Sequence, residues 1–142
     1  MIEKIREYLI ENNIVDENCR INVDFLGENP TEFAIIPIAV NPIIKKYING
    51  SSLRQYQFQL ISCNDYGADV MQNMDNSKFY EDLFNVIEQN NEEGNLPSII
   101  GVESIECLNN GAILDVTTNT ARYAIEMKIT YLKQGEKRIW KL

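Results

Sequence analysis

The sequence predicts a single α+β domain in which helices pack on one face of a mostly antiparallel sheet. Its length of 142 residues fits one domain and suffices for a self-supporting core. Residues 54–64 and 121–131 alternate apolar and polar side chains, which is typical of long strands with one buried face. Residues 2–12 and 77–93 carry apolar side chains at helical spacing, and helices beside an antiparallel sheet define the α+β class.

The N-terminal segment predicts an amphipathic helix over residues 2–12. Its apolar side chains share one face at the i, i+3, i+4 spacing, while charged side chains cover the other. The apolar face consists of Ile2, Ile5, Tyr8 and Leu9. Asn12 and Asn13 follow, and we expect this pair to end the helix.

Three shorter segments then have the period of a strand. Residues 21–25 alternate cleanly, which indicates a half-buried strand. Residues 33–38 predict a second strand, ended by prolines. Residues 43–48 alternate less cleanly, so either a short strand or an extended edge fits them, and two lysines would protect that edge from pairing.

The segment 54–64 predicts a one-sided strand. Its apolar side chains would face the core: Tyr56, Phe58 and Leu60. Its opposite side carries Gln55, Gln57 and Gln59. The second side of such a strand meets either solvent or a neighbouring subunit, and uncharged glutamines fit both.

A bend and a helix are expected in the middle of the chain. Residues 66–68 contain a glycine that breaks the strand, and residues 69–74 suggest a helical turn. A firmer helix begins at Asn76 or Ser77, both of which are good N-cap residues. Gly94 is expected to end that helix.

The last third predicts a β-meander. Asn109-Asn110-Gly111 separates the apolar segments 105–108 and 112–117, and Asn-Gly in that position favours a tight hairpin. A turn at residues 118–119 leads into the long strand at 121–131. We place the domain at residues 1–132 and treat residues 133–142 as a polar C-terminal extension.

Composition excludes several classes of function. Thirteen Lys and Arg stand against 21 Asp and Glu, for a net charge of −8, so the chain has no general attraction for nucleic acid. No apolar run approaches the roughly 20 residues that span a bilayer. The N-terminus lacks the pattern of a signal peptide, so we expect a cytoplasmic protein without membrane contact.

The absence of histidine removes the commonest general base and metal ligand. Catalysis by Ser-His-Asp, by Cys-His or by a histidine-dependent acyl transfer is excluded, while carboxylate, lysine or tyrosine chemistry stays open. Cys19, Cys63 and Cys107 lie far apart without a CxxC spacing, which argues against disulfides and zinc. We interpret Cys63 and Cys107 as small buried hydrophobes.

No motif assigns a catalytic, cofactor-binding or metal-binding residue. The glycines are isolated, so neither a P-loop nor a dinucleotide fingerprint exists, and residues 69–82 lack the spacing of an EF-hand. Paired acids favour surface solvation over glycosidase chemistry. These pairs are Glu92 and Glu93, Glu103 and Glu106, and Asp65 and Asp69.

A subunit or partner interface is the site that the pattern does favour. Arg54 opens a strand beside the three glutamines, and arginine is enriched at interfaces, although an ordinary surface arginine fits equally well. The predicted interface residues are Arg54, Gln55, Gln57, Gln59, Tyr66, Asp69 and Arg122.

Several short segments carry a family resemblance. They are residues 47–55, 66–70, 72–73, 75–77, 79–81, 94–97 and 120–123, together with residues 22–24 and 36–44. In order and spacing the chain resembles the minor capsid or minor tail proteins, tail-terminator-like, of long-tailed phages and prophages of Gram-positive bacteria. The resemblance covers roughly residues 1–132. The chain departs from the family pattern after Lys133, which leaves the role of the extension open.

The resemblance implies a structural role. Such proteins cap the tail tube as a six-fold ring, stop its polymerisation and offer a surface to the head connector. The implied partners are further copies of the chain in a homohexamer, the tail-tube protein and the head-connector protein. No cofactor, metal or small-molecule substrate is implied, and DNA would pass without specific binding. The implied location is the host cytoplasm during assembly, then the head-proximal end of the virion tail.

Two alternatives stay open at the level of sequence. A head-completion protein, or an adaptor of a related phage-tail-like particle, would have the same composition. A histidine-free enzyme would need a deep pocket with two convergent carboxylates of raised pKa. For the ring, the negative charge suggests a lumen that repels DNA phosphates.

Overall fold

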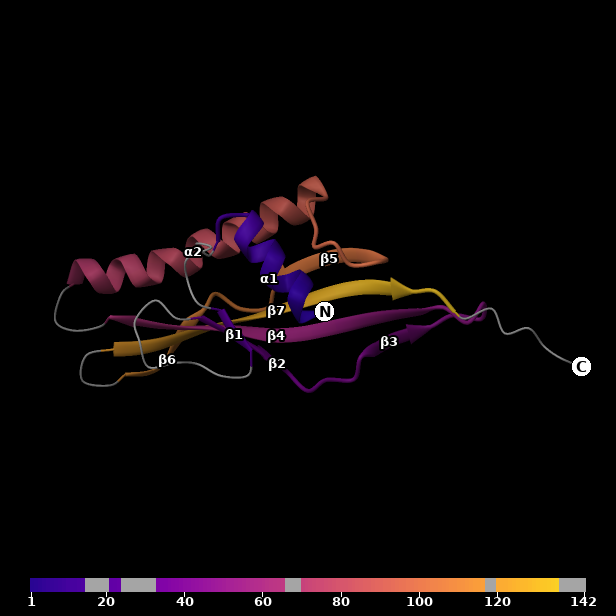
Figure 1. The fold of residues 1–142 in the computed structure, drawn as a ribbon, viewed down its shortest axis with the longest axis horizontal. Helices are drawn as coiled ribbons and strands as arrows, with labels where there is room; N and C mark the ends of the chain where they lie inside the picture. Colours follow the sequence, from indigo (N-terminus) through magenta and orange to yellow (C-terminus); the bar gives the residue numbers. More distant parts are fainter. Residues whose placement is uncertain (15–20, 24–32, 66–69, 117–119, 136–142) are drawn as a thin grey trace, which may run out of the picture.

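The computed structural model describes residues 1–14, 21–23, 33–65, 70–116 and 120–135. Within them two helices lie on one face of a single sheet, which confirms the predicted α+β class (Figure 1). The elements are α1 (Ile2–Glu11), β1 (Ile21–Val23), β2 (Phe33–Pro37), β3 (Ile43–Lys46), β4 (Ser52–Asp65), α2 (Val70–Glu93), β5 (Val102–Cys107), β6 (Ala112–Val116) and β7 (Thr120–Lys133). None of the helices so described is long and apolar enough to cross a membrane.

The sheet is built on its two longest strands. β4 and β7 pair antiparallel along their whole length, from Ser52 opposite Lys133 to Asp65 opposite Thr120. The shorter strands line up in tandem on the outer edges of this pair: β2 and β3 both pair with β4, and β5 and β6 both pair with β7. β1 pairs with β2 in parallel, while all other described pairings are antiparallel.

Three of the outer strands shift register once. The shifts lie between Ile43 and Lys45 in β3, between Val102 and Ser104 in β5, and between Ile113 and Asp115 in β6. An extra residue in one strand bends it and increases its twist. The outer edges of the sheet are therefore irregular where the central pair is regular.

The core lies between the helices and the sheet. The register places Phe58 beside Met127 and Leu60 beside Ile125, and all four side chains are buried on the helix side. The two helices contribute the other half of this layer with Ile5, Tyr8, Leu9, Tyr80, Leu83 and Ile87. The predicted alternation of both long strands is thus the alternation between core and opposite face.

A polar network joins α1 to the end of α2. The Tyr8 hydroxyl donates to the Asn95 carbonyl at 2.8 Å, and Asn90 Nδ2 donates to Tyr8 Oη at 3.0 Å and to Asn12 Oδ1 at 2.9 Å. Asn95 Nδ2 donates to the same Asn12 oxygen at 3.0 Å. Tyr8 and Asn90 are buried, and buried polar groups must be paired to avoid a desolvation penalty. Their pairing ties α1 to α2 and to the segment that follows it.

Both predicted helix ends are confirmed. α1 ends at Glu11, and the Asn12 side chain donates back to the Tyr8 carbonyl at 2.8 Å. α2 ends at Glu93, after which Gly94 takes a φ of +76° that glycine adopts without strain.

The predicted start of the second helix is wrong. α2 runs continuously from Val70, so Asn76 and Ser77 lie inside it and neither is an N-cap. Asn and Ser in a helix interior cost under about 0.7 kcal/mol each relative to Ala. An established helix adds a hydrogen bond with each further residue, which outweighs that cost.

The predicted hairpin at Asn109-Asn110-Gly111 is also wrong. β5 and β6 do not pair with each other but occupy the same edge of β7. The type I′ hairpin turn that Asn-Gly favours needs a positive φ at both central residues, and of Asn110 and Gly111 only Gly111, at +71°, has one. Instead, Asn109 Oδ1 accepts a hydrogen bond from the backbone N–H of Glu126 at 3.2 Å. This bond continues the hydrogen bonding to β7 in the segment between β5 and β6.

Residues 43–46 form a strand, which decides between the two alternatives for that segment. A turn at residues 47–51 joins β3 to β4, with Gly50 at a φ of +88° and the Tyr47 N–H donating to the Ser51 carbonyl at 2.9 Å. The predicted bend at residues 66–68, the turn at 118–119 and most of the C-terminal extension lie outside the described residues.

Candidate assembly interface

The helix-free side of the central strands carries a row of polar side chains. Three glutamines of β4 stand directly opposite three residues of β7: Gln55 opposite Thr130, Gln57 opposite Lys128 and Gln59 opposite Glu126. All six are partly exposed. We call these six residues the polar face.

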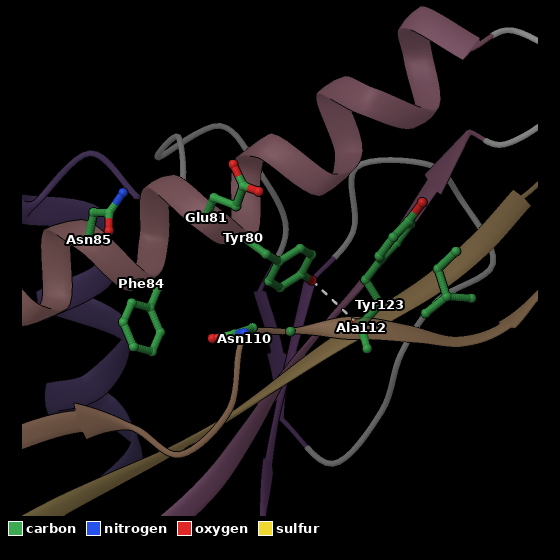
Figure 2. A pocket seen from close by; sticks show the side chains of 9 residues that line it. Tyr80, Glu81, Phe84, Asn85, Asn110, Ala112 and Tyr123 are labelled. Atoms are coloured by element: carbon green, nitrogen blue, oxygen red, sulfur yellow. Dashed lines mark hydrogen bonds between the residues drawn. The ribbon is translucent and has the colours of Figure 1, made fainter.

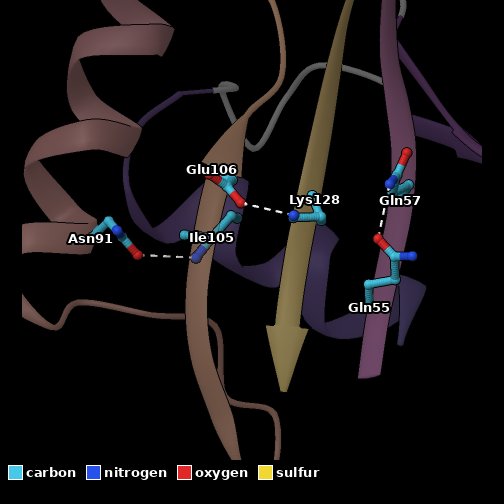
Figure 3. Close-up of polar contacts among 6 residues, drawn as sticks. All are labelled: Gln55, Gln57, Asn91, Ile105, Glu106 and Lys128. Atoms are coloured by element: carbon cyan, nitrogen blue, oxygen red, sulfur yellow. Dashed lines mark hydrogen bonds and ion pairs between the residues drawn. The ribbon is translucent and has the colours of Figure 1, made fainter. Parts of the chain in front are cut away.

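Hydrogen bonds hold the polar face in place along the sheet. Gln57 Nε2 donates to Gln55 Oε1 at 3.0 Å, and Lys128 Nζ lies 3.2 Å from Glu106 Oε1 on β5 (Figure 3). Gln59 Nε2 also donates to Glu126 Oε1, at 3.4 Å. Side chains already held by neighbours lose less conformational freedom when a partner binds, so the surface is preorganised.

The same side of the sheet is apolar toward its other end. Ala34, Ile61, Cys63 and Ala124 point to this side by register and are buried. Burial of Cys63 agrees with its interpretation as a small hydrophobe, and Cys107 is half-buried. The polar face therefore ends where these buried apolar side chains begin.

The structure brings together only some of the predicted interface residues. The three glutamines share the polar face, and Arg122 is exposed on the same side, roughly 13 Å further along at about 3.3 Å per residue. Arg54 lies on the helix side, where its Nε donates to Ser52 Oγ at 3.0 Å. Tyr66 and Asp69 lie outside the described residues.

The sequence analysis did not identify two groups of surface residues as interface candidates. Glu126, Lys128 and Thr130 alternate visibly in the sequence, but only the register of β7 on β4 places them beside the glutamines. The second group is the exposed apolar side chains at the β3–β4 turn, among them Ile48. The sequence did contain a sign of this group, because Ile48 directly precedes the Asn-Gly turn and residues in turns are mostly polar.

A cavity of about 450 Å³ opens between α2 and β6 (Figure 2). The residues that line it are Tyr80, Glu81, Phe84, Asn85, Asn110, Gly111, Ala112, Ile113 and Tyr123. Glu81 is the one carboxylate in this lining. The pair of convergent carboxylates that an enzyme of this composition would need does not occur among the described residues that line it.

Tyr80 forms the inner wall of this cavity. Its hydroxyl hydrogen-bonds to Ser62 and donates to the Tyr123 carbonyl at 3.3 Å, and its ring stacks on Tyr123 with 5.8 Å between centroids. Gly111 presses against the ring, since a Cβ there would lie 2.8 Å from Tyr80 Cδ1. Burial raises the pKa of Tyr80 well above its ordinary value of 10.0, so the phenol stays protonated.

Two other groups also have pKa values shifted further from neutral pH. Burial raises the pKa of Cys107 to about 12, with a further contribution from the Glu106 charge. Burial raises the pKa of Tyr8 as well. A base or nucleophile needs a pKa near the working pH, so these groups are unsuited to either role. Among residues whose side chains are described, no group of three or more His, Cys, Asp or Glu could hold a metal ion.

Neither a scan against protein-family models nor a search of curated proteins finds a match to this chain.

Proposed function

We propose that this protein is a structural subunit of a phage or prophage tail. It caps the tail tube as a ring of identical copies, stops polymerisation of the tube and helps to join tail to head. The observation that carries the proposal is the polar face, a preorganised strip of partly exposed side chains on the sheet side that has no helix. The resemblance of the sequence to tail-terminator-like proteins supports the same role.

The chemistry of the polar face suits contact between copies. Glutamine side chains offer both donors and acceptors without a charge, so burying them against a neighbour avoids the large desolvation penalty of an ion. The one lysine on the face is already paired with Glu106. Interfaces between separately folded proteins are about as polar as the rest of the surface, and this strip has that character.

A ring requires that one surface of a copy meets a different surface of the next. In the proposed homohexamer the polar face supplies one side of that contact. The two rims of the ring meet the end of the tail tube and the head connector. Part of the net charge of −8 lines the lumen, where it repels DNA phosphates and lets DNA pass without binding.

The test uses the purified full chain and the tail-tube protein encoded in the same genome. Size-exclusion chromatography with light scattering, followed by electron microscopy of the tubes, should show a ring at tube ends and shorter tubes. The variant Gln57→Arg should lose end-binding, whereas Gln89→Arg, at an exposed glutamine of α2, should retain it. A monomer that never binds tube ends would contradict the proposal.

Two further outcomes decide its details. Binding to the head connector without binding to tubes would instead favour the head-completion role. A ring whose lumen is neutral or basic would remove the proposed role of the negative charge.

A further inference from the structure

The turn between β3 and β4 presents apolar side chains to solvent. Ile44 is 46% exposed, Tyr47 is 38% exposed and Ile48 is exposed along its whole length, at 109%. Lys45 and Lys46, also exposed, stand among them. We call residues 44–48 the tip. A group of exposed apolar residues rimmed by charge is typical of an interaction site.

The structure holds the tip in one shape. Ser51 donates from its backbone N–H to Asn49 Oδ1 at 3.0 Å, and Lys45 Nζ lies 5.4 Å from the centre of the Tyr47 ring. Gly135 packs against the turn so closely that a Cβ on it would lie 2.5 Å from the Gly50 carbonyl carbon. The sheet also extends past both helices at this end, so the tip projects from the body of the protein (Figure 1).

The cavity between α2 and β6 has complementary chemistry. Tyr80 and Tyr123 give it aromatic walls, and Ile113 of β6 is 44% exposed beside it. Glu81 lies on its lining and is exposed to solvent. Its volume of about 450 Å³ falls within the roughly 300–1,000 Å³ range of ligand pockets, which is ample for one or two side chains.

Charge is divided between the two surfaces. Residues 33–64, which include the tip, contain three basic residues and no acidic one, although the whole chain has a net charge of −8. α2, which forms one wall of the cavity, contains six acidic residues and one basic residue. Opposite charges on separate surfaces steer association and fix its direction.

The two surfaces lie at diagonal corners of the sheet. The tip adjoins Ser52 on the outer side of β4, whereas Ile113 pairs with Tyr123 on the outer side of β7, at the level of Ser62. Along the strands this separation is roughly 33 Å, at about 3.3 Å per residue. The continuous pairing of β4 with β7 keeps them apart, so the tip of one copy reaches only the cavity of another.

We infer that the tip of one copy inserts into the cavity between α2 and β6 of the next copy. Ile48 fills the cavity, and Lys45 and Lys46 face Glu81 at its mouth. The contact joins two different surfaces, so successive copies add head to tail and a ring closes when every tip is seated. The inference rests on the proposed function and supplies one of the contacts that hold its ring together.

The first experiment weakens the tip by the substitution Ile48→Asp. Association of the purified chain, followed by analytical ultracentrifugation and by ring formation on tube ends, should weaken at least tenfold. The matched control is Ile100→Asp, which changes an isoleucine of similar exposure, at 93%, outside the tip. The inference fails if the two variants associate equally well.

The second experiment exchanges charges across the contact. Lys45→Glu together with Lys46→Glu should weaken association, and Glu81→Lys in the same chain should restore it. The matched control is Glu88→Lys, which makes the same change in net charge as Glu81→Lys at an exposed position of α2 outside the cavity lining. Restoration by Glu81→Lys but not by Glu88→Lys separates a direct contact from a change in net charge. No restoration would overturn the assignment of Glu81 as partner of the lysines.

The third experiment mixes two defective chains. Asn85→Trp, at an exposed position of α2, fills the cavity, and Ile48→Asp disables the tip. Neither variant should associate alone, whereas an equimolar mixture retains one intact contact per pair and should give dimers without rings. Circular dichroism confirms that both variants fold.

The outcomes separate the inference from the proposed function. If the wild-type chain forms rings on tubes and all of these variants do so equally well, the tip contact is wrong and the proposed function stands. If the tip and cavity variants lose an association that wild type shows without any binding to tubes, the contact is right and the proposed function is wrong. A wild-type chain that never associates overturns both.

Discussion

The two faces of the β4–β7 pair differ although they alternate along the same strands. On the helix-covered face Phe58 is fully buried, while its neighbour Gln57 on the other face is partly exposed and bonded to Gln55. One face contributes to stability by removing apolar surface from water, and the other presents polar groups without burying them. Under the proposed function, adjacent residues of one strand serve folding and association separately, so substitutions should separate the two properties.

Alkaline pH should have the largest effect, because it acts on three groups of the covered face at once. Burial raises the pKa values of Tyr8, Tyr80 and Cys107, so the folded protein keeps protons that the unfolded chain releases above about pH 9 to 10. The free energy of unfolding therefore falls as pH rises through this range, and these groups cause no change near neutral pH. Circular dichroism during a pH titration, together with urea denaturation at each pH, measures this loss of stability. An unchanged spectrum and an unchanged urea midpoint at pH 11 would contradict the prediction.

Truncating a core side chain should come next. Phe58→Ala removes a fully buried ring between the sheet and the helices, and such truncations cost about 3–5 kcal/mol. Urea denaturation gives the value directly. A cost below about 1 kcal/mol would mean that this face is not the core of the domain.

Gly111→Ala should cost about 2–4 kcal/mol. Its φ of +71° is strained for alanine, by about 1–2 kcal/mol, and the new methyl group meets the Tyr80 ring. Gly94→Ala is the matched control, because its φ of +76° is similar but a Cβ there meets nothing within 4 Å. Equal losses of stability in the two variants would show that Tyr80 moves aside at no cost.

Asn90→Ala should cost about 1–3 kcal/mol, because it removes a buried side chain that bonds both Tyr8 and Asn12. The neighbouring Gln89→Ala removes only an exposed bond to Glu93 and should change stability by less than about 0.5 kcal/mol. Thermal unfolding followed by circular dichroism compares the two variants. Similar midpoints would argue that α1 is held by its apolar contacts alone.

Gln57→Ala should have the smallest effect on stability, within about 0.5 kcal/mol, since it lies on the exposed face. Under the proposed function it should nevertheless weaken association, which light scattering measures. This variant sharpens the comparison with Phe58→Ala most directly, because the two residues are adjacent. A large loss of stability would show instead that the polar face supports the fold.

The parts of the fold that were predictable from sequence are those that depend on patterns among neighbouring residues. The alternation in β4 and β7, the asparagines after α1 and Gly94 after α2 each act over a few residues, and the structure confirms them. The tandem pairing of short strands on long ones depends on register between distant segments, which local alternation does not encode. For that reason the Asn109–Gly111 segment was wrongly predicted as a hairpin.

The candidate interface was predictable in the same partial way. The glutamines of β4 stand out in the sequence, but their partners on β7 required the pairing of two strands more than 60 residues apart. Arg54 was grouped with the glutamines because it is next to them in sequence, although its even position in the alternation assigns it to the side of Tyr56. The tip became visible only as exposed apolar area.

The register shifts of β3, β5 and β6 have a consequence for behaviour at high concentration. Under the proposed function the chain associates with itself, and such a protein risks adding copies edge to edge without limit, as amyloid-forming strands do. Outer strands that bend within four to six residues offer no long straight template for such growth. Under the proposed function, these short bent edges oppose fibril growth before the chain assembles on a tail tube.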